Sequence, residues 1–493
     1  MKKVCINNSE KYLNIYIPLF LVLAGFLWKL IYIGTRDICL DEPFTIFHAQ
    51  KSIGEIIKMS TTYEPTPPLF MLLIHFWIKL FGISAPSVRI LPLVFNAFTL
   101  LFIYLTGKRF VSFWGGLLAS GLFLLSDLHF FYGLNTRTYS LVSLETAASL
   151  YFFLCYAANQ KDRKALAGLI ITNLLLVYSH YFGWFVILSQ VISGFLYTRN
   201  LKMFFRFLIP PFVTAIGFIP MIPTVIRLFI TKSHKGTWLN PVKTGDYLNQ
   251  LYSYLNFKDA FWLILAIIVE GIIFTLIILY LKKGKGSGIN ALVLLLWWII
   301  PYSIMFFISF KVPMFSNSYN LFNSIGLYLF IAAVINFLFQ RDKFLEPAFG
   351  LAVLIIMGGH MKILPRNFSY REVSKPVNFV KSIKSENNIV MIYPYWYDLP
   401  FAYYYNRKIF TDTENFEDLM KTNELFNVWG LPGAKQVVEL NPGKGIIYVQ
   451  DGSMFEPNTS IFAYLDSAYV KRDSLFFPET LKVVVYDPKP GSN

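Results

Sequence analysis

The sequence predicts an all-α polytopic membrane protein with a small α/β domain at its C-terminal end. Hydrophobic residues make up 55% of the 493 residues and charged residues only 15%, against about 25% charged residues in soluble domains. The mean hydropathy is +0.50. Apolar segments of membrane-spanning length recur along residues 1–364, whereas residues 365–493 have the composition of a soluble protein.

Eleven apolar segments are expected to span the membrane, because each approaches the roughly 20 residues that a helix needs to cross the hydrocarbon core. They lie near residues 13–33, 87–107, 111–126, 139–158, 165–180, 182–198, 207–226, 259–281, 289–310, 320–339 and 346–364. A further run, residues 67–82, is shorter and carries His75 and Lys79. We expect this run to be a juxtamembrane helix within an outer loop of residues 34–86.

The distribution of basic residues predicts the orientation. The net charge is +15, yet residues 365–493 hold 14 basic and 15 acidic residues, so the excess lies in the membrane part. If residues 67–82 do not span, sixteen basic residues fall in short inner loops, against Arg137 and Lys311 in the short outer loops downstream. This arrangement obeys the positive-inside rule and gives no reason to expect nucleic-acid binding. The N-terminus is then cytoplasmic, and residues 365–493 are extracytoplasmic.

The segment after residue 370 alternates between strand and helix patterns, which predicts the α/β domain. We expect helices over residues 371–385 and 399–405, and strands over residues 389–393, 408–411, 445–450 and 481–486. The predicted organisation is therefore a transmembrane domain of residues 1–364 followed by an extracytoplasmic domain of residues 365–493.

Acidic residues of the membrane part cluster in the first outer loop. Five of its 14 acids are Asp37, Asp41, Glu42, Glu55 and Glu64. Asp41 and Glu42 precede a proline that suits the first turn of a helix, so a surface helix is expected over residues 43–60. The pair either caps that helix or takes part in chemistry. Glu64 lies among prolines, which hold its backbone near the bilayer surface. It is either a solvated loop acid or a functional carboxylate.

Two further outer turns are rich in polar side chains. Arg137, at the mouth of one helix, either reaches lipid headgroups or holds a phosphate. Glu145 is expected about two turns deeper on the same helix, roughly on the same face as Arg137, and is an intramembrane ionisable group. His180 either donates to a phosphate, binds a metal or marks the interface. These groups and the acidic loop are predicted to meet at the outer boundary, which is what glycosyl transfer from a lipid-phosphate donor requires.

Four stretches of the sequence resemble the GT-C glycosyltransferases that use polyprenyl-phosphate sugars, the group of protein O-mannosyltransferases and lipid A aminoarabinose transferases. They are Leu40-Asp41-Glu42-Pro43-Phe44-Thr45; Glu64-Pro65-Thr66-Pro67-Pro68-Leu69 with His75, Trp77, Phe81-Gly82 and Arg89; Tyr132 to Leu141 with Arg137 and Tyr139; and Ser179-His180-Tyr181-Phe182. The likeness covers residues 12–364 and implies a GT-C fold in a bacterial inner membrane. In that family the first acid of the Asp-Glu pair is the proposed base and often contacts a metal. The resemblance therefore implies these roles for Asp41.

Two departures from that family concern the phosphate site. Many relatives carry Gln-Glu before the arginine, where this chain has Leu134-Asn135. A basic Arg-Tyr-Leu pattern in a late outer loop is here Ser318-Tyr319-Asn320-Leu321. The phosphate site is therefore expected to be rebuilt, or the activity altered.

The resulting hypothesis is an inverting glycosyltransferase, of hexosyl or pentosyl type, that moves a sugar from a polyprenyl-phosphate donor to an extracytoplasmic glycan, lipid or protein. Its expected catalytic residues are Asp41 and Glu42; its expected substrate-binding residues are Arg89, Arg137, Tyr139, His180, Tyr181 and Glu64; and Asp41 and Glu64 are candidate ligands of Mg²⁺ or Mn²⁺. One alternative is a transporter or flippase of a lipid-linked saccharide, for which repeats and interrupted helix pairs are expected. Another is a non-catalytic glycan-assembly protein on a degenerate GT-C fold.

Overall fold

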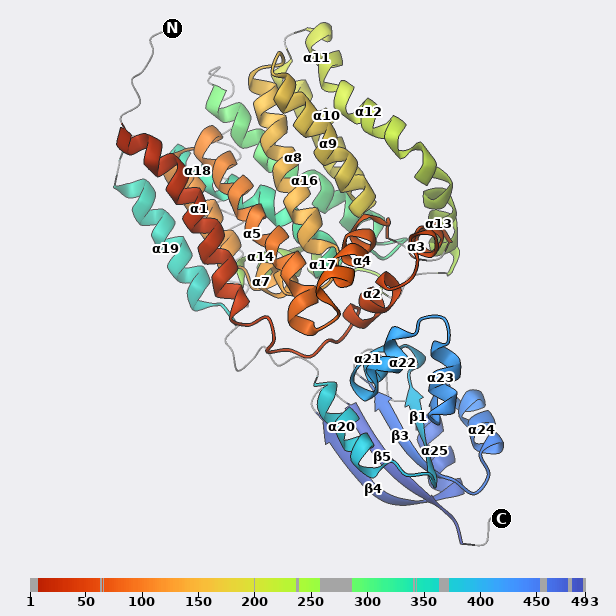
Figure 1. The fold of residues 1–493 in the computed structure, drawn as a ribbon. Coiled ribbons are helices and arrows are strands. Elements are labelled where there is room, and N and C mark those ends of the chain that lie inside the picture. Colours follow the sequence, from red (N-terminus) through yellow and green to blue (C-terminus); the bar gives the residue numbers. More distant parts are fainter. Residues whose placement is uncertain are drawn as a thin grey trace. The chain divides into compact units, whose positions relative to one another are not determined.

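A computed structural model describes residues 8–62, 64, 66–198, 200–235, 239–257, 286–339, 342, 344–362, 372–452, 459–477 and 481–490. The chain packs as two compact units (Figure 1). The helical unit comprises Met1–Ile33, Gly54–Leu73 and Pro86–Leu364. The sheet unit comprises Gly34–Ile53, Ile74–Ala85 and Pro365–Asn493, so it includes much of the first outer loop. The prediction of a separate domain over residues 365–493 stays a prediction, since packing does not test independent folding.

The helical unit is built from long and short helices that run side by side in its centre (Figure 1). Its elements are α1 (Asn8–Leu30), α3 (Ile53–Thr62), α5 (Ala85–Phe110), α6 (Phe113–Leu125), α7 (Asp127–Gly133), α8 (Tyr139–Ala158), α9 (Arg163–Ser179), α10 (Gly183–Tyr197), α11 (Leu201–Phe207), α12 (Ile209–Phe218), η1 (Ile219–Met221), α13 (Ile222–Lys235), α14 (Thr244–Leu255), α16 (Gly286–Ile308), α17 (Asn317–Asn320), η2 (Leu321–Asn323), α18 (Ser324–Phe339) and α19 (Leu345–Gly359). Helix α4 (Leu69–Phe81) begins in this unit and ends in the sheet unit.

Ten of the eleven predicted spanning segments coincide with helices, and the segment 259–281 lies outside the described residues. By length and composition, five described helices can cross a membrane, or six if the bent pair α6 and α7 forms one span. This is a multi-pass membrane protein; the total of eleven spans stays a prediction. The bend between α6 and α7 measures 66° and falls at Ser126, whose hydroxyl caps α7 by accepting from the backbone N–H of His129.

Small residues allow close helix packing inside the helical unit. A Cβ atom on Gly107 of α5 would lie 2.6 Å from the Cα of Gly116 on α6, so neither position tolerates a side chain without movement of the backbone. Small residues at crossings are typical of membrane helices, where packing replaces the hydrophobic driving force.

A buried polar triad joins three helices of the same unit. Ser149 of α8 donates to the side-chain oxygen of Asn173 on α9 at 2.8 Å, and Asn173 donates to Gln190 of α10 at 2.8 Å. The amide of Gln190 donates back to Ser149 and Asn173, both at 2.8 Å. The triad therefore satisfies its own polar groups, as the apolar surroundings require.

The sheet unit contains one mixed five-stranded sheet of order β2-β1-β3-β5-β4. Its elements are α2 (Glu42–Ala49), α20 (Ser374–Ile383), β1 (Asn388–Tyr393), η3 (Tyr395–Tyr397), α21 (Asp398–Tyr405), α22 (Arg407–Thr411), α23 (Phe416–Thr422), β2 (Leu425–Asn427), α24 (Leu431–Leu440), β3 (Gly445–Asp451), α25 (Thr459–Ala468), β4 (Tyr469–Phe477) and β5 (Leu481–Pro488). Strand β1 pairs in parallel with β2 and β3, and β5 pairs antiparallel with β3 and β4.

Helices cover both faces of this sheet. On one face, Ala434 of α24 and Leu465 of α25 pack against alternate residues of the central strands, including Ile446 and Tyr448. On the other face, α20 contacts α21 and β5. Every residue of β3 is buried, as expected for a central strand covered on both sides.

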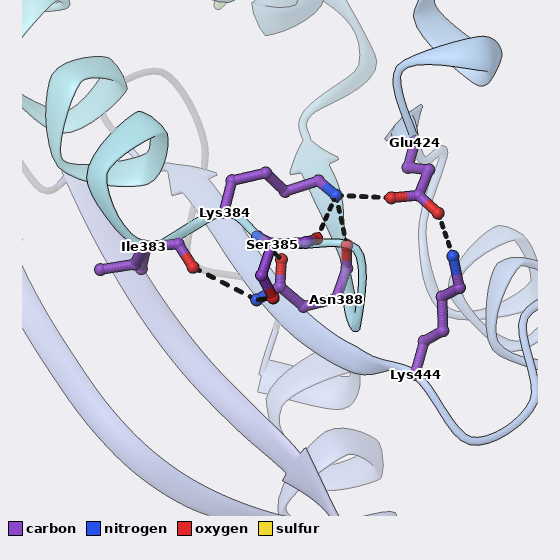
Figure 2. Close-up of polar contacts among 6 residues, drawn as sticks. All are labelled: Ile383, Lys384, Ser385, Asn388, Glu424 and Lys444. Carbon is purple, nitrogen blue, oxygen red and sulfur yellow. Dashed lines mark hydrogen bonds and ion pairs between the residues drawn. The ribbon is translucent and has the colours of Figure 1, made fainter.

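The amino ends of the parallel strands are joined by a network of ion pairs (Figure 2). Glu424, just before β2, accepts from Lys384 at 2.5 Å and also pairs with Lys444, just before β3. Lys384 donates as well to the backbone oxygen of Asn388, the first residue of β1, at 2.5 Å. One carboxylate thus ties the starts of three strands together.

Two local predictions were wrong. Residues 408–411 form helix α22 rather than a strand, because Asn406 caps it by accepting from the backbone N–H of Lys408 at 3.0 Å. The single surface helix expected over residues 43–60 is broken into α2 and α3. The two helices pack in different units: the Phe47 ring of α2 contacts Phe410 and Phe416 of the sheet unit, whereas α3 lies largely in the helical unit.

Candidate functional site

Asp41 stands at the N-terminus of α2 in the sheet unit. It occupies the N-cap position, but its side chain makes no capping hydrogen bond. The preceding residue, Leu40, has a φ of 56°, a left-handed conformation that is unusual for a bulky side chain. Such strain concentrates at functional sites. The capping explanation for Asp41 therefore loses its main support.

The Asp41 side chain lines a pocket of about 60 Å³ that lies wholly within the sheet unit. The pocket is lined by Cys39, Leu40, Asp41, Val373, Trp396, Tyr397, Pro400, Asp451 and Leu481. The segment before α2 supplies three of these residues, and the C-terminal part of the chain supplies the other six. A second carboxylate, Asp451, and two aromatic side chains therefore share this pocket with Asp41.

The loop that carries Asp41 is fastened to the rest of the sheet unit by hydrogen bonds. A carboxylate oxygen of Asp37 accepts from the backbone N–H of Ser374 at 2.7 Å. The hydroxyl of Tyr404 accepts from the backbone N–H of Ile38 at 2.6 Å. These contacts place the residues before Asp41 against α20 and α21.

Glu42 is held in a buried ion pair, and its predicted catalytic role stays a prediction. Its carboxylate accepts from Arg36 at 3.2 Å, and both side chains are buried. A buried ion pair of this kind is costly to break, since the remaining charge would lose its partner. The geometry thus separates the two neighbouring acids: Asp41 lines the pocket, and Glu42 holds the loop.

In the helical unit, the turns containing Arg137 and His180 lie at the same end of the antiparallel pair α8 and α9. The hydroxyl of Thr138, at the start of α8, donates to the backbone oxygen of Ser179, at the end of α9, at 3.1 Å. Ser179 also donates to one carboxylate oxygen of Glu145 at 2.9 Å, while the second has no hydrogen-bond partner within the described chain. Arg137 precedes α8, so it does not share a helix face with Glu145.

Tyr139, His180 and Phe182 gather around Tyr319. The Tyr319 ring lies 6.3 Å from that of Tyr139, 5.6 Å from that of His180 and 5.7 Å from that of Phe182, between ring centroids. The half-buried Arg137 acts electrostatically on His180. Three stretches singled out in the sequence therefore meet here, including the late loop in which the usual basic pattern is missing.

Tyr181, Glu64 and Arg227 form a second group in the helical unit. Burial and, to a lesser extent, the carboxylate of Glu64 raise the pKa of Tyr181 to about 12, against the opposing charge of Arg227. The Tyr181 hydroxyl is buried and makes no hydrogen bond to any described residue. Glu64 is nearly buried and accepts from the hydroxyl of Thr66 at 2.7 Å. The Tyr181 phenol stays protonated near neutral pH, so it is able to donate a hydrogen bond.

Arg89 contacts the backbone near α1, and its role in substrate binding stays a prediction. It is almost completely buried and donates to the backbone oxygen of Ile33 at 3.1 Å, which fastens the chain after α1 to the start of α5.

Sequence reasoning missed a related contact made by Lys29, a lysine in an apolar helix. Lys29 is fully buried, donates to the backbone oxygen of His129 at 3.0 Å and also bonds to the side chain of Asn96.

The described residues do not form a metal-binding cluster. No group of three His, Cys, Asp or Glu side chains suited to hold an ion occurs among them. In the pocket of the sheet unit, Asp41 and Asp451 are the only two carboxylates among the lining residues. Mg²⁺ is commonly held by one or two carboxylates with waters, so a divalent cation at Asp41 or Glu64 stays a prediction.

Comparisons with known proteins agree on the fold. Residues 65–226 match a family model described as dolichyl-phosphate-mannose-protein mannosyltransferase. The crystal structure of ArnT from Cupriavidus metallidurans bound to undecaprenyl phosphate aligns with 95% of this chain and 97% of its own, at a TM-score of 0.57 and 10% identity. The apo oligosaccharyltransferase of Archaeoglobus fulgidus aligns with 98% of this chain and 76% of its own, at a TM-score of 0.54 and 11% identity. No curated protein sequence matches this chain.

The resemblance to GT-C glycosyltransferases expected from the sequence is therefore confirmed. The predicted fold class is confirmed as well: a mostly helical membrane part with several apolar helices and a small C-terminal sheet domain. The solved structures have less than 25% identity to this chain, so they establish its fold and leave its substrates to the chemistry of its residues.

Proposed function

We propose that this protein is an inverting glycosyltransferase that moves a sugar from a polyprenyl-phosphate donor to a hydroxyl group of an extracytoplasmic acceptor. The observation that carries the proposal is Asp41: within this fold it stands at a helix N-terminus, makes no capping bond and lines a pocket. The match to a mannosyltransferase family model and the fold shared with ArnT bound to undecaprenyl phosphate support a lipid-linked donor.

Asp41 is the proposed general base. Its carboxylate accepts the proton of the acceptor hydroxyl as the hydroxyl oxygen bonds to the anomeric carbon. The bond from that carbon to the donor phosphate breaks in the same displacement, which inverts the anomeric centre. A carboxylate suits this role because Asp is ionised near neutral pH and accepts hydrogen bonds only.

The helical unit is the proposed donor site. Arg137 offers a planar fork that can hold two phosphate oxygens. The hydroxyls of Tyr139, two residues after Arg137, and of Tyr181, next to His180, are further donors. His180 adds a further nitrogen close to the Arg137 charge. These groups would stabilise the negative charge that develops on the departing lipid phosphate. Glu64, beside Tyr181, is the reserve candidate for the base.

Orientation belongs to the same proposal. We propose a bacterial inner membrane with the N-terminus in the cytoplasm and the sheet unit outside, on the strength of the basic inner loops. In intact spheroplasts, an impermeant thiol reagent should label a cysteine at the exposed Glu414 of the sheet unit and spare one at the exposed Lys161, between α8 and α9. Both variants need a background in which Cys5 and Cys39 are replaced by Ser. The reverse labelling pattern would invert the orientation.

Sugar transfer is tested in the cell and in vitro. A deletion strain should lose one sugar from a surface glycan, lipid or protein and accumulate the matching polyprenyl-phosphate sugar, as read by mass spectrometry. Purified protein in nanodiscs should then release that sugar from the isolated donor when extract from the deletion strain supplies the acceptor. A flippase would instead leave the sugar on its lipid, and a non-catalytic assembly protein would show no turnover. Either result would contradict the proposal.

A further inference from the structure

The pocket that contains Asp41 lies at a special point of the sheet. The chain leaves β1 into the connection to β2 on one side, and β3 lies on the other side of β1. Trp396 and Tyr397 follow β1 directly, and Asp451 is the last residue of β3, so both carboxyl ends open into this pocket. In open α/β sheets of this strand order, ligands bind at the switch point between these two strands. The topology alone therefore points to a ligand here.

The lining of the pocket indicates which chemistry it recognises. Among the described residues that line it, the pocket contains two carboxylates, Asp41 and Asp451, and no Lys or Arg. Carboxylates accept hydrogen bonds from hydroxyl groups, and they repel phosphates and other anions. Aromatic rings of Trp396 and Tyr397 lie beside them and offer apolar faces. An uncharged sugar has hydroxyl groups that donate hydrogen bonds and an apolar ring face that packs on aromatic side chains, so it matches both parts of this lining.

An exposed aromatic surface continues from the pocket along the same edge of the sheet. Trp429, just after β2, is 73% exposed and stacks on Tyr395, with ring centroids 3.4 Å apart and planes 14° from parallel. Trp396 is itself 37% exposed. A pocket of about 60 Å³ holds only part of a sugar ring, so further rings of an acceptor would lie over these side chains.

The opposite edge of the sheet serves as an internal comparison. There the ends of the same three strands are joined by Glu424, Lys384 and Lys444, which pair with one another (Figure 2). The amino edge is therefore closed by ion pairs, whereas the carboxyl edge combines acids with aromatic rings in a pocket.

We propose that the sheet unit carries the acceptor site, and that the acceptor is an uncharged saccharide whose reactive end enters the pocket between Asp41, Asp451 and Trp396. This inference rests on the proposed function, and it assigns Asp451 and Trp396 as positioning residues. Asp451 orients the sugar by accepting from hydroxyls that do not react. Trp396 covers one face of the ring.

Ligand-observed saturation-transfer NMR with the full-length protein in nanodiscs tests the acceptor class directly. The probes are methyl glycosides of mannose, galactose, glucose and N-acetylglucosamine, with disaccharides of each. Mannose phosphate and a short Ser/Thr peptide represent the anionic and protein acceptors. At least one neutral saccharide should bind, and Asp451→Asn and Trp396→Ala should each weaken its binding about tenfold, the scale of one hydrogen bond to a charged group. Asp473→Asn and Phe476→Ala, at exposed sites on β4, are matched controls and should leave it unchanged.

Binding of undecaprenyl phosphate, followed in parallel by native mass spectrometry, separates this inference from the proposed function. If the lipid binds equally to wild type and pocket variants while only the variants lose the saccharide, the inference holds. Binding of mannose phosphate or the peptide that is lost in the pocket variants overturns it, as does saccharide binding that ignores both substitutions or no saccharide binding at all. A protein that binds saccharide through Asp451 but never undecaprenyl phosphate would refute the donor and leave the pocket as a saccharide site. The thermal unfolding temperature of each variant confirms that its fold is intact.

Discussion

In the helical unit polar side chains are buried in small groups, whereas in the sheet unit charged side chains meet at the edges of a sheet. The triad of Ser149, Asn173 and Gln190 closes on itself, because no water is available in a bilayer to satisfy a missing partner. Glu424 can hold two lysines at the amino edge of the sheet because water supports the charges there. A polar group without a protein partner is therefore costly in the helical unit, whereas water can satisfy such a group at an edge of the sheet.

In the helical unit, some buried polar groups have all their hydrogen bonds satisfied and others do not. The triad is fully satisfied and explains itself by packing. Tyr181 and Glu145 each keep a buried oxygen atom without a hydrogen-bond partner among the described residues. Such atoms are rare in native proteins, and each calls for an explanation. Both lie near the end of the bundle that carries Arg137 and His180, but Tyr104, Thr106 and Ser193 keep such atoms elsewhere in the unit. An unpartnered atom therefore supports the proposed donor site only together with the charged groups beside it.

The largest expected effect concerns Glu42 of the sheet unit. Glu42→Gln leaves the buried Arg36 without its counter-charge, so the sheet unit should lose about 3 kcal/mol of unfolding free energy. Hydrogen-exchange mass spectrometry of peptides from residues 34–53 and 372–405 would show this loss as faster exchange. The Asp41→Asn variant is the matched control, because Asp41 makes no capping bond. Equal protection in the two variants would remove the distinction between the two acids.

Asp41→Asn should act on turnover instead. Asn keeps the size of the side chain and loses the basic oxygen, so sugar transfer should fall by roughly 100-fold or more. Binding of undecaprenyl phosphate should stay unchanged, because the proposed donor site belongs to the helical unit. Glu55→Gln alters an exposed acid of the same loop and should keep full activity. If folded Asp41→Asn transfers sugar at the wild-type rate, Glu64 becomes the base to test.

Arg137 provides the converse test in the helical unit. Arg137→Lys retains the charge but loses the planar fork, so affinity for undecaprenyl phosphate should fall about tenfold. Native mass spectrometry at graded lipid concentrations measures this change. Arg163→Lys, at the opposite end of α9, should bind normally. Unchanged binding in Arg137→Ala would reduce Arg137 to an interfacial anchor.

The sequence predicted ten helical segments that the structure shows, whereas the total of eleven spans and the roles of the site residues stay predictions. Long apolar segments predict helices because a bilayer leaves the backbone few alternatives. The meeting of Tyr139 and His180 follows from the helix ends on which they lie. The role of Tyr319 was not foreseen, because its loop was judged only by the basic residue that it lacks.

The sheet unit was less predictable. Asp451 and Trp396 join Asp41 only through tertiary packing across more than half of the chain, and no local pattern encodes that contact. Helix α22 was mistaken for a strand because its pair Ile409 and Phe410 is apolar, while the cap at Asn406 was overlooked. Arg89 and Lys29 were hard to judge as well, since a buried cation that bonds to backbone oxygens looks like a binding residue in the sequence alone.

A smaller effect is expected from the polar triad. Ser149 and Ser143 are both fully buried on α8, but Ser149 bonds to another helix and Ser143 bonds to the backbone of its own helix at 2.9 Å. Ser149→Ala should therefore lower stability by about 1 kcal/mol, the usual scale of an interhelical hydrogen bond in membranes. Ser143→Ala should cost much less. Unfolding of the detergent-solubilised protein compares the two, and equal losses would show that the triad adds no specific stability.

The smallest expected effect lies at the amino edge of the sheet and depends on pH. Burial of Glu424 acts to raise its pKa, but the hydrogen bonds and charges of Lys384 and Lys444 outweigh it and hold the pKa below its ordinary value. Because the folded pKa lies below the unfolded one, of about 4.3, the ionised carboxylate stabilises the fold above that pH. The contribution is lost as the pH falls through the folded pKa.

Glu424→Gln should accordingly destabilise the sheet by about 0.5 to 1 kcal/mol near neutral pH, since the pair is partly exposed and screened by solvent. The difference from wild type should shrink as the pH falls below about 4. Hydrogen exchange of peptides covering β1, β2 and β3 measures both values, and Glu439→Gln, at an exposed position of α24, controls for the loss of one charge. Saccharide binding at the carboxyl edge should be the same in both variants. If Glu424→Gln weakened it, the two edges of the sheet would not be independent, and the contrast between a structural and a functional edge would fail.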